Sequence, residues 1–167
     1  LDDNKREIYN KNKTAFRYSK LLNYWIFVIS DNMYEFKKRV KTKKWPIFNN
    51  TSHRKHLEMG DSVMFYKAGR DQGQSFLGTG KISTDLKLIV NSMDFEINLD
   101  EIIIWKNFPS IRNHLSKLSF IKSELNWGVY LQTGVIKSTK KDFVLISNTA
   151  KKIENTKTVS DSEKNFL

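Results

Sequence analysis

Hydrophobic residues gather in short runs in the middle of the chain, and both ends are polar. Residues 24–29 form a continuous aromatic and β-branched run, which predicts a strand buried on both faces. Residues 61–68 and 75–83 are predicted to form a hairpin, because the segment 69–73 between them carries two glycines and polar turn residues. A third long strand is predicted over 95–105, with a bulge or a solvent-facing side where its interior is polar.

A basic amphipathic helix is predicted directly after the first strand. Met33, Phe36 and Val40 recur at helical spacing, which leaves the lysines of this segment on the opposite face. Ser30, Asp31 or Asn32 caps its N-terminus, and Glu35 lies three residues after Asn32 as in a capping box.

Two later helices are predicted from their start signals. Pro109 is suited to the first turn of a short helix. Ser138 is predicted to cap a last helix that turns Phe143, Val144 and Ile146 inward. Together these elements predict an α+β domain over 23–150, in which short helices flank a curved mixed sheet. Residues 1–22 are interpreted as an N-terminal extension or linker, and 151–167 as a polar tail.

The composition narrows the class of protein. The chain has 167 residues, 39% hydrophobic and 13% aromatic, enough for one folded domain. It has no cysteine, hence no disulfide framework or thiol metal site, as expected of an intracellular, cytoplasmic protein. Its apolar runs are shorter than the ~18–20 residues of a membrane span. It begins with Leu1 rather than Met, which favours a fragment of a longer chain.

Positive charge is concentrated in one region. The formal net charge is +11, and ten basic against two acidic residues between positions 37 and 70 contribute +8 of it. Such a block favours a polyanionic partner, most commonly nucleic acid, although a solvated helix face is the simpler interpretation of any charge run. The candidate phosphate contacts are Lys37, Lys38, Lys41, Lys43, Lys44, Arg54 and Lys55.

Trp45 follows this basic run, and a flat ring beside cations is suited to stacking on a nucleic-acid base. The amide and hydroxyl groups of Asn49, Asn50 and Thr51 could bind a base edge, or could form a plain turn with a helix cap. Trp45 itself could equally belong to the core. Trp127, before Gly128, is a second candidate wall of the pocket, whereas Trp25 and Trp105 are assigned to the core.

The sequence offers little support for catalysis. His53 and His56 are spaced to share a helix face and could bind a metal, but no HExxH pattern accompanies them, so they are interpreted as surface histidines. Residues 78–81, Gly-Thr-Gly-Lys, lack the Walker spacing and fall within a predicted strand. Their glycines are interpreted as bulge or close-approach positions. No catalytic residue, metal or cofactor is predicted.

Several short motifs resemble those of a known family. They are Ser30 after the first strand, Trp45 after the helix, Met-Gly-Asp at 59–61, Phe-Leu-Gly at 76–78 and Asn-Trp-Gly at 126–128. Over residues 24–147 the chain resembles the EVE branch of the PUA-like superfamily and the related YTH domains. The resemblance implies a curved, barrel-like fold whose aromatic pocket holds a single, often modified, base. It implies that Trp45 is a wall of this pocket and that Ser30 lines it.

The chain also departs from the YTH pattern. Ile29 and Pro46 replace residues that are usual there, and the loop 84–94, where YTH domains carry a second cage tryptophan, holds no aromatic residue.

The function predicted from sequence is therefore a non-catalytic reader of DNA or RNA. It would accept one base, modified as the resemblance implies, as the recognition module of a larger chain such as a modification-dependent restriction system. The alternatives are a general PUA-type RNA-binding module, a hydrolase using His53 and His56, and a protein-interaction domain with a basic face.

Overall fold

The structure is a computed structural model that describes residues 21–70 and 73–164, with side chains described as far as Glu154. Most of the predicted N-terminal extension, 1–22, lies outside the described residues.

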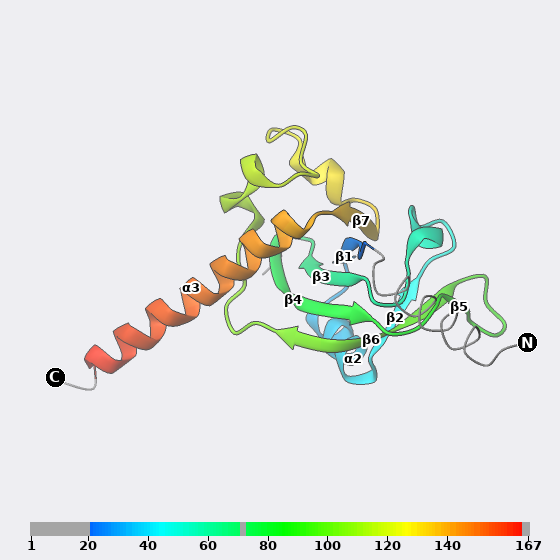
Figure 1. Ribbon diagram of the computed structural model, residues 1–167, viewed down its shortest axis with the longest axis horizontal. Coiled ribbons are helices and arrows are strands. Elements are labelled where there is room, and N and C mark those ends of the chain that lie inside the picture. The colour runs from blue at the N-terminus through cyan, green and yellow to red at the C-terminus, as the bar shows by residue number, and fades with distance from the viewer. Residues whose placement is uncertain (1–20, 71–72, 165–167) are drawn as a thin grey trace, which may run out of the picture.

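A seven-stranded mixed sheet forms the body of the domain (Figure 1). Its strands are β1 (Tyr24–Ile29), β2 (Lys44–Ile47), β3 (Ser62–Lys67), β4 (Ser75–Ile82), β5 (Lys87–Leu88), β6 (Phe95–Ile104) and β7 (Val135–Ser138). They lie in the order β2-β6-β4-β3-β1-β7, with β5 beside β6. The pair β1–β3 is parallel, and its neighbours pair antiparallel. The predicted α+β fold with a curved mixed sheet is confirmed.

The predicted long strands are confirmed, while the short strands β2, β5 and β7 were missed because two to four residues carry too little periodicity. The predicted bulge lies in the β4–β6 pair, where the register shifts between Thr79 and Lys81. Gly78 permits a close approach at this place, because a Cβ on it would overlap the Ile103 carbonyl oxygen. The interpretation of Gly78 as a close-approach position is therefore confirmed.

The helix predicted after the first strand is α2 (Met33–Thr42), and it is capped as predicted. Asn32 Oδ1 accepts a hydrogen bond from the Glu35 N–H at 3.0 Å. The helix ends at Lys43, whose left-handed backbone (φ 57°) turns the chain into β2.

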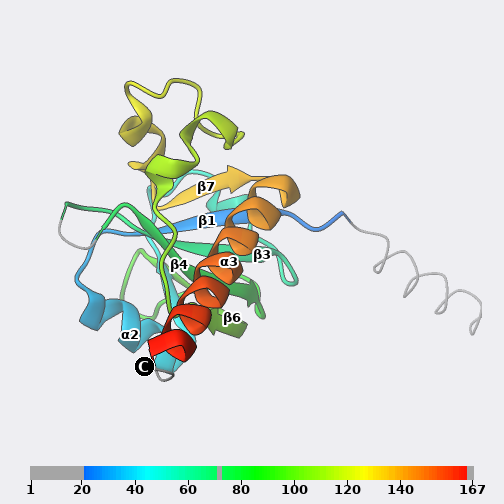
Figure 2. The same cartoon turned by 90° about the vertical axis from the view of Figure 1, so that its left-hand side faces the viewer.

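The predicted short helix after Pro109 is instead two 3₁₀ turns, η2 (Ile111–Asn113) and η3 (Leu115–Lys117). A further turn, η4 (Trp127–Leu131), precedes β7, and η1 (Arg54–His56) follows β2. Figure 2 shows the η2–η4 segment stacked at one end of the sheet.

The last helix, α3 (Lys140–Lys164), differs from the prediction in three ways. Its cap is Thr139, whose Oγ1 accepts from the Asp142 N–H at 3.2 Å, whereas Ser138 Oγ donates to the Asp142 carboxylate. Val144 is exposed, although Phe143 and Ile146 are buried as expected. Helix α3 continues to Lys164, through most of the segment predicted to be a tail, and extends away from the sheet (Figures 1 and 2).

Side chains on the two faces of the sheet belong to separate hydrophobic cores. Phe27, Phe65 and Trp45 lie in the core that α2 closes with Phe36. Tyr66 lies in the core of the opposite face, which the η2–η4 segment and α3 cover. The division follows from the two-residue period of a strand, which alternates consecutive side chains between faces.

The buried carboxylate of Asp61 ties the start of β1 to the entry of β3. It accepts hydrogen bonds from the Trp25 Nε1–H at 2.8 Å and from the backbone N–H groups of Asn23 and Glu58, each at 3.1 Å. These charge-assisted bonds satisfy the buried indole N–H of Trp25, whose assignment to the core is confirmed.

Candidate functional site

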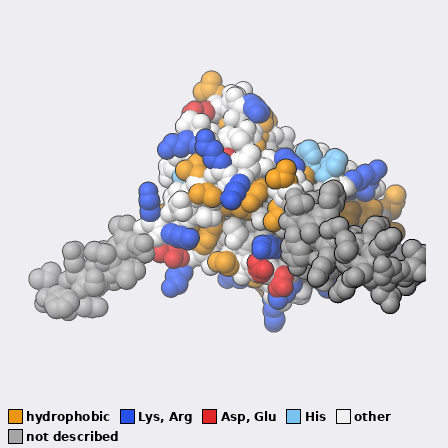
Figure 3. Space-filling model, viewed as in Figure 1, with side chains coloured by type: hydrophobic (Ala, Val, Ile, Leu, Met, Phe, Trp, Pro, Cys, Tyr) orange, Lys and Arg blue, Asp and Glu red, His pale blue; other side chains and the backbone are white. Residues whose placement is uncertain are grey.

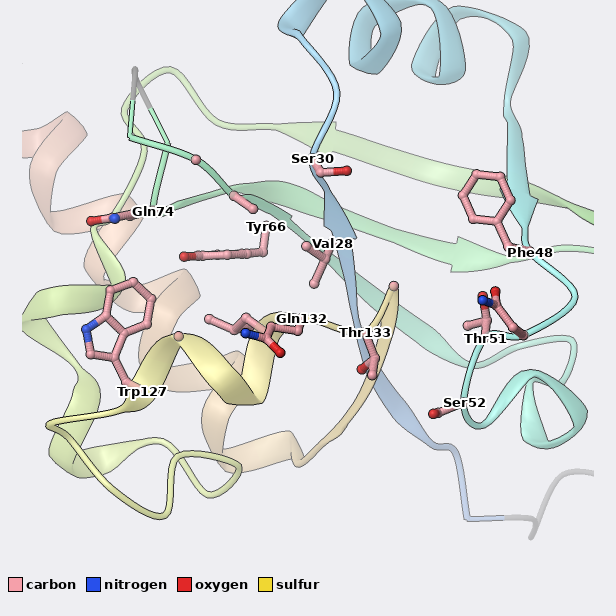
Figure 4. Close-up of a pocket in the computed structure, with 16 residues that line it drawn as sticks. Val28, Ser30, Phe48, Thr51, Ser52, Tyr66, Gln74, Trp127, Gln132 and Thr133 are labelled. Carbon is pink, nitrogen blue, oxygen red and sulfur yellow. The ribbon is translucent and has the colours of Figure 1, made fainter.

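A pocket of about 610 Å³ opens where the carboxyl ends of β1 and β3 meet the η4 turn and the loop after β2 (Figure 4). This volume falls within the usual range of small-molecule pockets. Sixteen residues line it: Val28, Ser30, Phe48, Asn50, Thr51, Ser52, Tyr66, Ala68, Gly69, Gln74, Trp127, Gly128, Leu131, Gln132, Thr133 and Gly134.

The floor of the pocket is set by strand register. Val28 of β1 pairs with Tyr66 of β3, so both side chains leave the sheet on the same face. Their neighbours Phe27 and Phe65 project to the other face and fill the core beneath α2. The Gly134 carbonyl oxygen accepts from the Val28 N–H at 2.9 Å, which fixes the η4–β7 segment beside the floor.

Tyr66 is 1% exposed, and its ring centroid lies 5.3 Å from that of Phe76. Burial raises the pKa of the Tyr66 hydroxyl well above its ordinary value, and the nearby positive charge of Arg112 opposes this shift only in part. The hydroxyl is therefore protonated throughout the physiological range and can donate a hydrogen bond. In Figure 4 it points toward the end of the pocket where Gln74 and Trp127 lie.

Gln74, Arg112 and Trp127 form one connected unit at this end. Arg112 Nε donates to Gln74 Oε1 at 2.8 Å, and the guanidinium lies 5.4 Å from the centroid of the Trp127 ring. The backbone of Gln74 is left-handed (φ 62°) and is held by hydrogen bonds with the Lys67 carbonyl (2.6 Å) and the Ile111 N–H (2.9 Å). Because Arg112 occupies Oε1, the amide NH₂ of Gln74 remains as the donor at this end of the pocket.

The opposite wall is the loop after β2, with Phe48, Thr51 and Ser52 in Figure 4. This loop is a closed turn, since the Thr51 N–H donates to the Phe48 carbonyl at 3.0 Å. Phe48 is 53% exposed and forms an apolar edge at the mouth of the pocket.

The pocket brings together four of the predicted base-pocket residues: Ser30, Asn50, Thr51 and Trp127. Asn49 does not line the pocket. It is exposed, and its backbone N–H donates to Asp94 Oδ1 at 2.9 Å.

The prediction that Trp45 is a pocket wall needs correction. Trp45 is 2% exposed and lies in the core beneath α2, where its ring stacks on Phe65 at a centroid distance of 5.1 Å. It is on the opposite side of the sheet from Tyr66. The cation over its ring is Arg39, at 4.9 Å, and Arg39 is itself paired with Asp31 at 2.6 Å. The alternative interpretation of Trp45 as core is the one that the structure supports.

The predicted phosphate contacts are exposed except for Arg54, which is half-buried with its guanidinium 4.8 Å from the centroid of Phe95. Among the described residues, three of them form ion pairs. Lys38 pairs with Glu35 of the same helix (3.9 Å), and Lys43 and Lys44 pair with Asp100 (3.1 Å) and Glu96 (3.5 Å) of β6. Such exposed pairs contribute little energy and leave the cations available to phosphates. Lys43 lowers the pKa of Asp100, chiefly through the side-chain hydrogen bond between them.

Lys37 and Lys41 flank a second, apolar hollow formed by Met33, Val40, Ile104 and Phe108. Figure 3 shows that Lys and Arg side chains are spread over the visible face rather than confined to one element. The phosphate-binding role of the basic residues stays a prediction.

His53 and His56 are exposed, with ring centroids 6.0 Å apart. Within the described part of the chain, no cluster of three or more His, Asp or Glu side chains is arranged to hold a metal ion. None of the helices in the described ranges has the length and apolarity to cross a membrane.

Sequence reasoning missed five residues that form much of the site: Phe48, Tyr66, Gln74, Arg112 and Gln132. A signal existed for Tyr66, since it ends the Val-Met-Phe-Tyr run on the face that alternation separates from Phe65. Gln74 and Arg112 are 38 positions apart, and no local pattern predicts that they meet.

Comparisons with known proteins agree with this architecture. Among solved structures, human THYN1 in complex with 5-methylcytosine-containing DNA aligns with a TM-score of 0.54 at 9% identity, covering 77% of this chain and 97% of that one. The N-terminal domain of Staphylothermus marinus McrB aligns with a TM-score of 0.52 at 11% identity, covering 77% and 95%. The YTH domain-containing protein mmi1, in an RNA complex, aligns with a TM-score of 0.53 at 17% identity, covering 80% and 87%.

These likenesses, with the curled sheet and its two helices, define the fold as PUA-like. Residues 23–98 match the family model of the EVE domain, so the resemblance seen in the motifs of the chain is confirmed. A search of curated proteins gives no significant match.

Proposed function

We propose that the chain is a non-catalytic nucleic-acid reader that accepts a single, modified base in the pocket between Tyr66 and Trp127. The observation that carries the proposal is the pocket itself. It joins the half-buried ring of Trp127 to the buried ring of Tyr66 and to convergent hydrogen-bonding groups, on an EVE domain.

The energetics require this combination of groups. Extruding a base from a duplex costs a few kcal/mol, and stacking on one aromatic ring returns about 1–3 kcal/mol. Hydrogen bonds to the base edge must supply the remainder. Tyr66, Gln74, Ser30 and Asn50 line the pocket, and their hydroxyl and amide groups would make these hydrogen bonds.

Positive charge near the pocket supports a polyanionic ligand. Arg112 is exposed beside Trp127, and Arg54 and Lys55 follow directly after the loop that forms the opposite wall. Phosphates on either side of an inserted base would meet these cations, which would give binding a marked salt dependence.

The structural neighbours support the choice of ligand class. THYN1 is described with 5-methylcytosine-containing DNA, and mmi1 with RNA. The likeness to the N-terminal domain of McrB supports the further proposal that this domain serves as the recognition module of a modification-dependent restriction system. The mmi1 likeness equally favours a second candidate function, RNA binding of the PUA type without preference for a modified base.

The test is a competition binding assay at about 150 mM salt, where bulk electrostatics are screened. Single-stranded DNA, duplex DNA and RNA would each be compared with the same oligonucleotide carrying one N6-methyladenine, 5-methylcytosine or 5-hydroxymethylcytosine. A tenfold preference for one modification, about 1.4 kcal/mol, would establish a reader. Equal binding of modified and unmodified RNA would favour the second candidate, and binding of neither DNA nor RNA would refute both.

Replacement of Trp127 assigns the binding to the pocket. We expect Trp127→Ala to weaken binding by roughly 5- to 150-fold, the equivalent of about 1–3 kcal/mol of lost stacking. Tyr34→Ala is the matched control, because Tyr34 is 73% exposed on α2 and does not line the pocket.

A further inference from the structure

The turn between β5 and β6 exposes an unusual group of apolar side chains. Leu88 is 61% exposed, Val90 is 84% exposed and Met93 is 76% exposed. Single exposed apolar residues are ordinary, but three within six positions of one turn form a patch that water solvates poorly. Figure 1 shows this turn projecting from the end of the molecule at β5.

The turn is rigidly built. The Ile89 N–H donates to the Asp94 carbonyl at 3.0 Å, and the Ser92 N–H donates to the Ile89 carbonyl at 3.1 Å. The Asp94 N–H donates to Ser92 Oγ at 3.0 Å, and Asn91 takes the left-handed conformation (φ 62°) that closes the turn. The backbone that carries Val90 and Met93 is therefore already ordered, so that binding would have to order only their side chains.

The turn is also fastened to the rim of the pocket. Asp94 Oδ1 accepts from the Asn49 N–H at 2.9 Å, and the neighbours of Asn49 on both sides, Phe48 and Asn50, line the pocket. Phe48 is itself 53% exposed. The exposed ring of Phe48, an apolar edge of the pocket, and the exposed apolar side chains of the turn thus lie on two segments that this hydrogen bond joins.

The charges around this edge complement a polyanion. Lys87 is exposed on β5, and Lys55 is exposed in η1. Arg54 lies over the ring of Phe95, the first residue after the turn, at 4.8 Å. Of the nearby acids, Asp94 is engaged with Asn49, and Glu96 pairs with Lys44 at 3.5 Å. Proteins that insert apolar side chains into a base stack place basic residues beside them, which contact the flanking phosphates. The turn, with its apolar tip between cations, has the same combination of groups.

We propose that the β5–β6 turn is a wedge that inserts Val90 and Met93 into a nucleic-acid duplex beside the base that enters the pocket. The inference rests on the proposed function and names its preferred partner, a duplex rather than a single strand. Removing a base from a duplex leaves its neighbours unstacked, and apolar side chains placed against them recover part of that loss. A single strand needs no such compensation.

The experiment compares the wild-type chain with the double variant Val90→Ser/Met93→Ser. The probes are a duplex containing one 5-methylcytosine flanked by 2-aminopurine, and the same modified strand alone. Both substitutions are at exposed positions, so the fold is expected to be retained, and a thermal melt would check this. Val144→Ser, at a 49% exposed valine of α3 that does not line the pocket, is the matched control.

We expect the double variant to bind the duplex at least tenfold more weakly and to lose the rise in 2-aminopurine fluorescence that reports unstacking. Its affinity for the single strand should stay within twofold of the wild-type value. Equal losses on both probes, or no loss on the duplex, would overturn the wedge while leaving the pocket intact. Failure of the wild-type chain to bind either probe, or any of the other DNA and RNA oligonucleotides of the competition assay, would instead refute the proposed function. Binding to anionic phosphatidylserine vesicles that depends on Val90 and Met93, without an effect on the duplex, would reassign the turn to a membrane surface and overturn the wedge.

Discussion

The indole of Trp45 stacks on the ring of Phe65, with centroids 5.1 Å apart and an interplanar angle of 25°, inside the core beneath α2. The ring of Phe27 lies 5.5 Å from Trp45 on another side. Trp45 is thus an anchor between β2 and the central strands, although its place after a basic helix suggests a ligand contact.

Replacement of Trp45 is expected to affect stability and spare binding. Trp45→Ala should lower the free energy of unfolding by about 3–5 kcal/mol, because it empties a fully packed aromatic site. Trp45→Phe, which keeps a ring against Phe65, should cost clearly less. Urea denaturation measures both, and ligand affinity under folded conditions should stay within about threefold of wild type. A stable Trp45→Ala protein that fails to bind would return Trp45 to the pocket.

The amide of Gln74 is expected to act as a hydrogen-bond donor to the ligand. Gln74→Glu keeps the acceptor that Arg112 uses at 2.8 Å but removes the NH₂ group. We expect ligand affinity to fall by about tenfold while the melting temperature is retained, measured by titration and thermal melt. Unchanged affinity in Gln74→Glu would exclude this role.

Arg112 is expected to act through Trp127 as well as directly on phosphate. A double-mutant cycle of Arg112→Ala with Trp127→Ala should give a coupling free energy of roughly 0.5–1 kcal/mol, the usual value of an exposed cation–π contact. Arg112→Lys tests the planar guanidinium, since a lysine retains the charge without the Nε–H group that donates to Gln74. Strictly additive effects in the cycle would show that the two residues act independently.

His114 is expected to make the protein less stable in mild acid. It is 6% exposed with neither ring nitrogen hydrogen-bonded, and burial, followed by the charge of Lys117, lowers its pKa from 6.5. The unfolded chain therefore binds a proton more readily than the folded one. The stability that neutral His114 contributes is fully present above about pH 6.5, the pKa in the unfolded chain. It is lost as the pH falls from there through the lower pKa of the folded state.

Urea midpoints at pH 7.5 and 5.5 measure this loss, in a range where ordinary carboxylates do not titrate strongly. His114→Leu removes both the titration and the unsatisfied nitrogens, so its midpoint should be at least as high as that of wild type and nearly independent of pH. His56→Asn, at an exposed site, should behave as wild type. If the urea midpoint of His114→Leu fell between pH 7.5 and 5.5 as much as that of wild type, the pH dependence would belong to another titrating group.

Gly78 is expected to be intolerant of any side chain. A Cβ there would overlap the backbone carbonyl of Ile103 on β6, which cannot move without breaking the sheet. Gly78→Ala should cost roughly 2–4 kcal/mol. Gly80→Ala is the matched control in the same strand, because its Cβ would meet the Phe65 ring at 3.3 Å, where a small shift suffices, and about 1 kcal/mol is expected. Equal melting temperatures for the two variants would contradict this account.

The residues that the sequence placed correctly are those governed by local rules. The run 24–29, the strands around the hairpin and the Asn32 cap are each determined by alternation, turn residues or capping within a few positions. Ser30 and Trp127 were found through motifs that resemble those of EVE domains, and Asn50 and Thr51 through the hydrogen-bonding groups of their side chains.

Other features needed contacts between distant segments. The ion pairs of Lys43, between α2 and β2, and of Lys44, in β2, join this region to acids of β6 more than fifty positions later. Arg112 orients Gln74 across 38 positions, and the turn carrying Asp94 fixes Asn49 across 45. None of these distances is encoded in spacing along the chain.

The sequence alone thus determined the resemblance to EVE domains, the order of the main elements and the basic character of the chain, because short motifs, strand alternation, helical spacing and net charge are local or additive properties. The tertiary structure decided on which side of the sheet each aromatic ring lies. Trp45 is turned into the core and Tyr66 into the pocket by the register between β1 and β3 and by the pairing of β2 with β6. A shift of one residue in such a pairing moves every side chain of the strand to the other face, and only packing selects between the two registers.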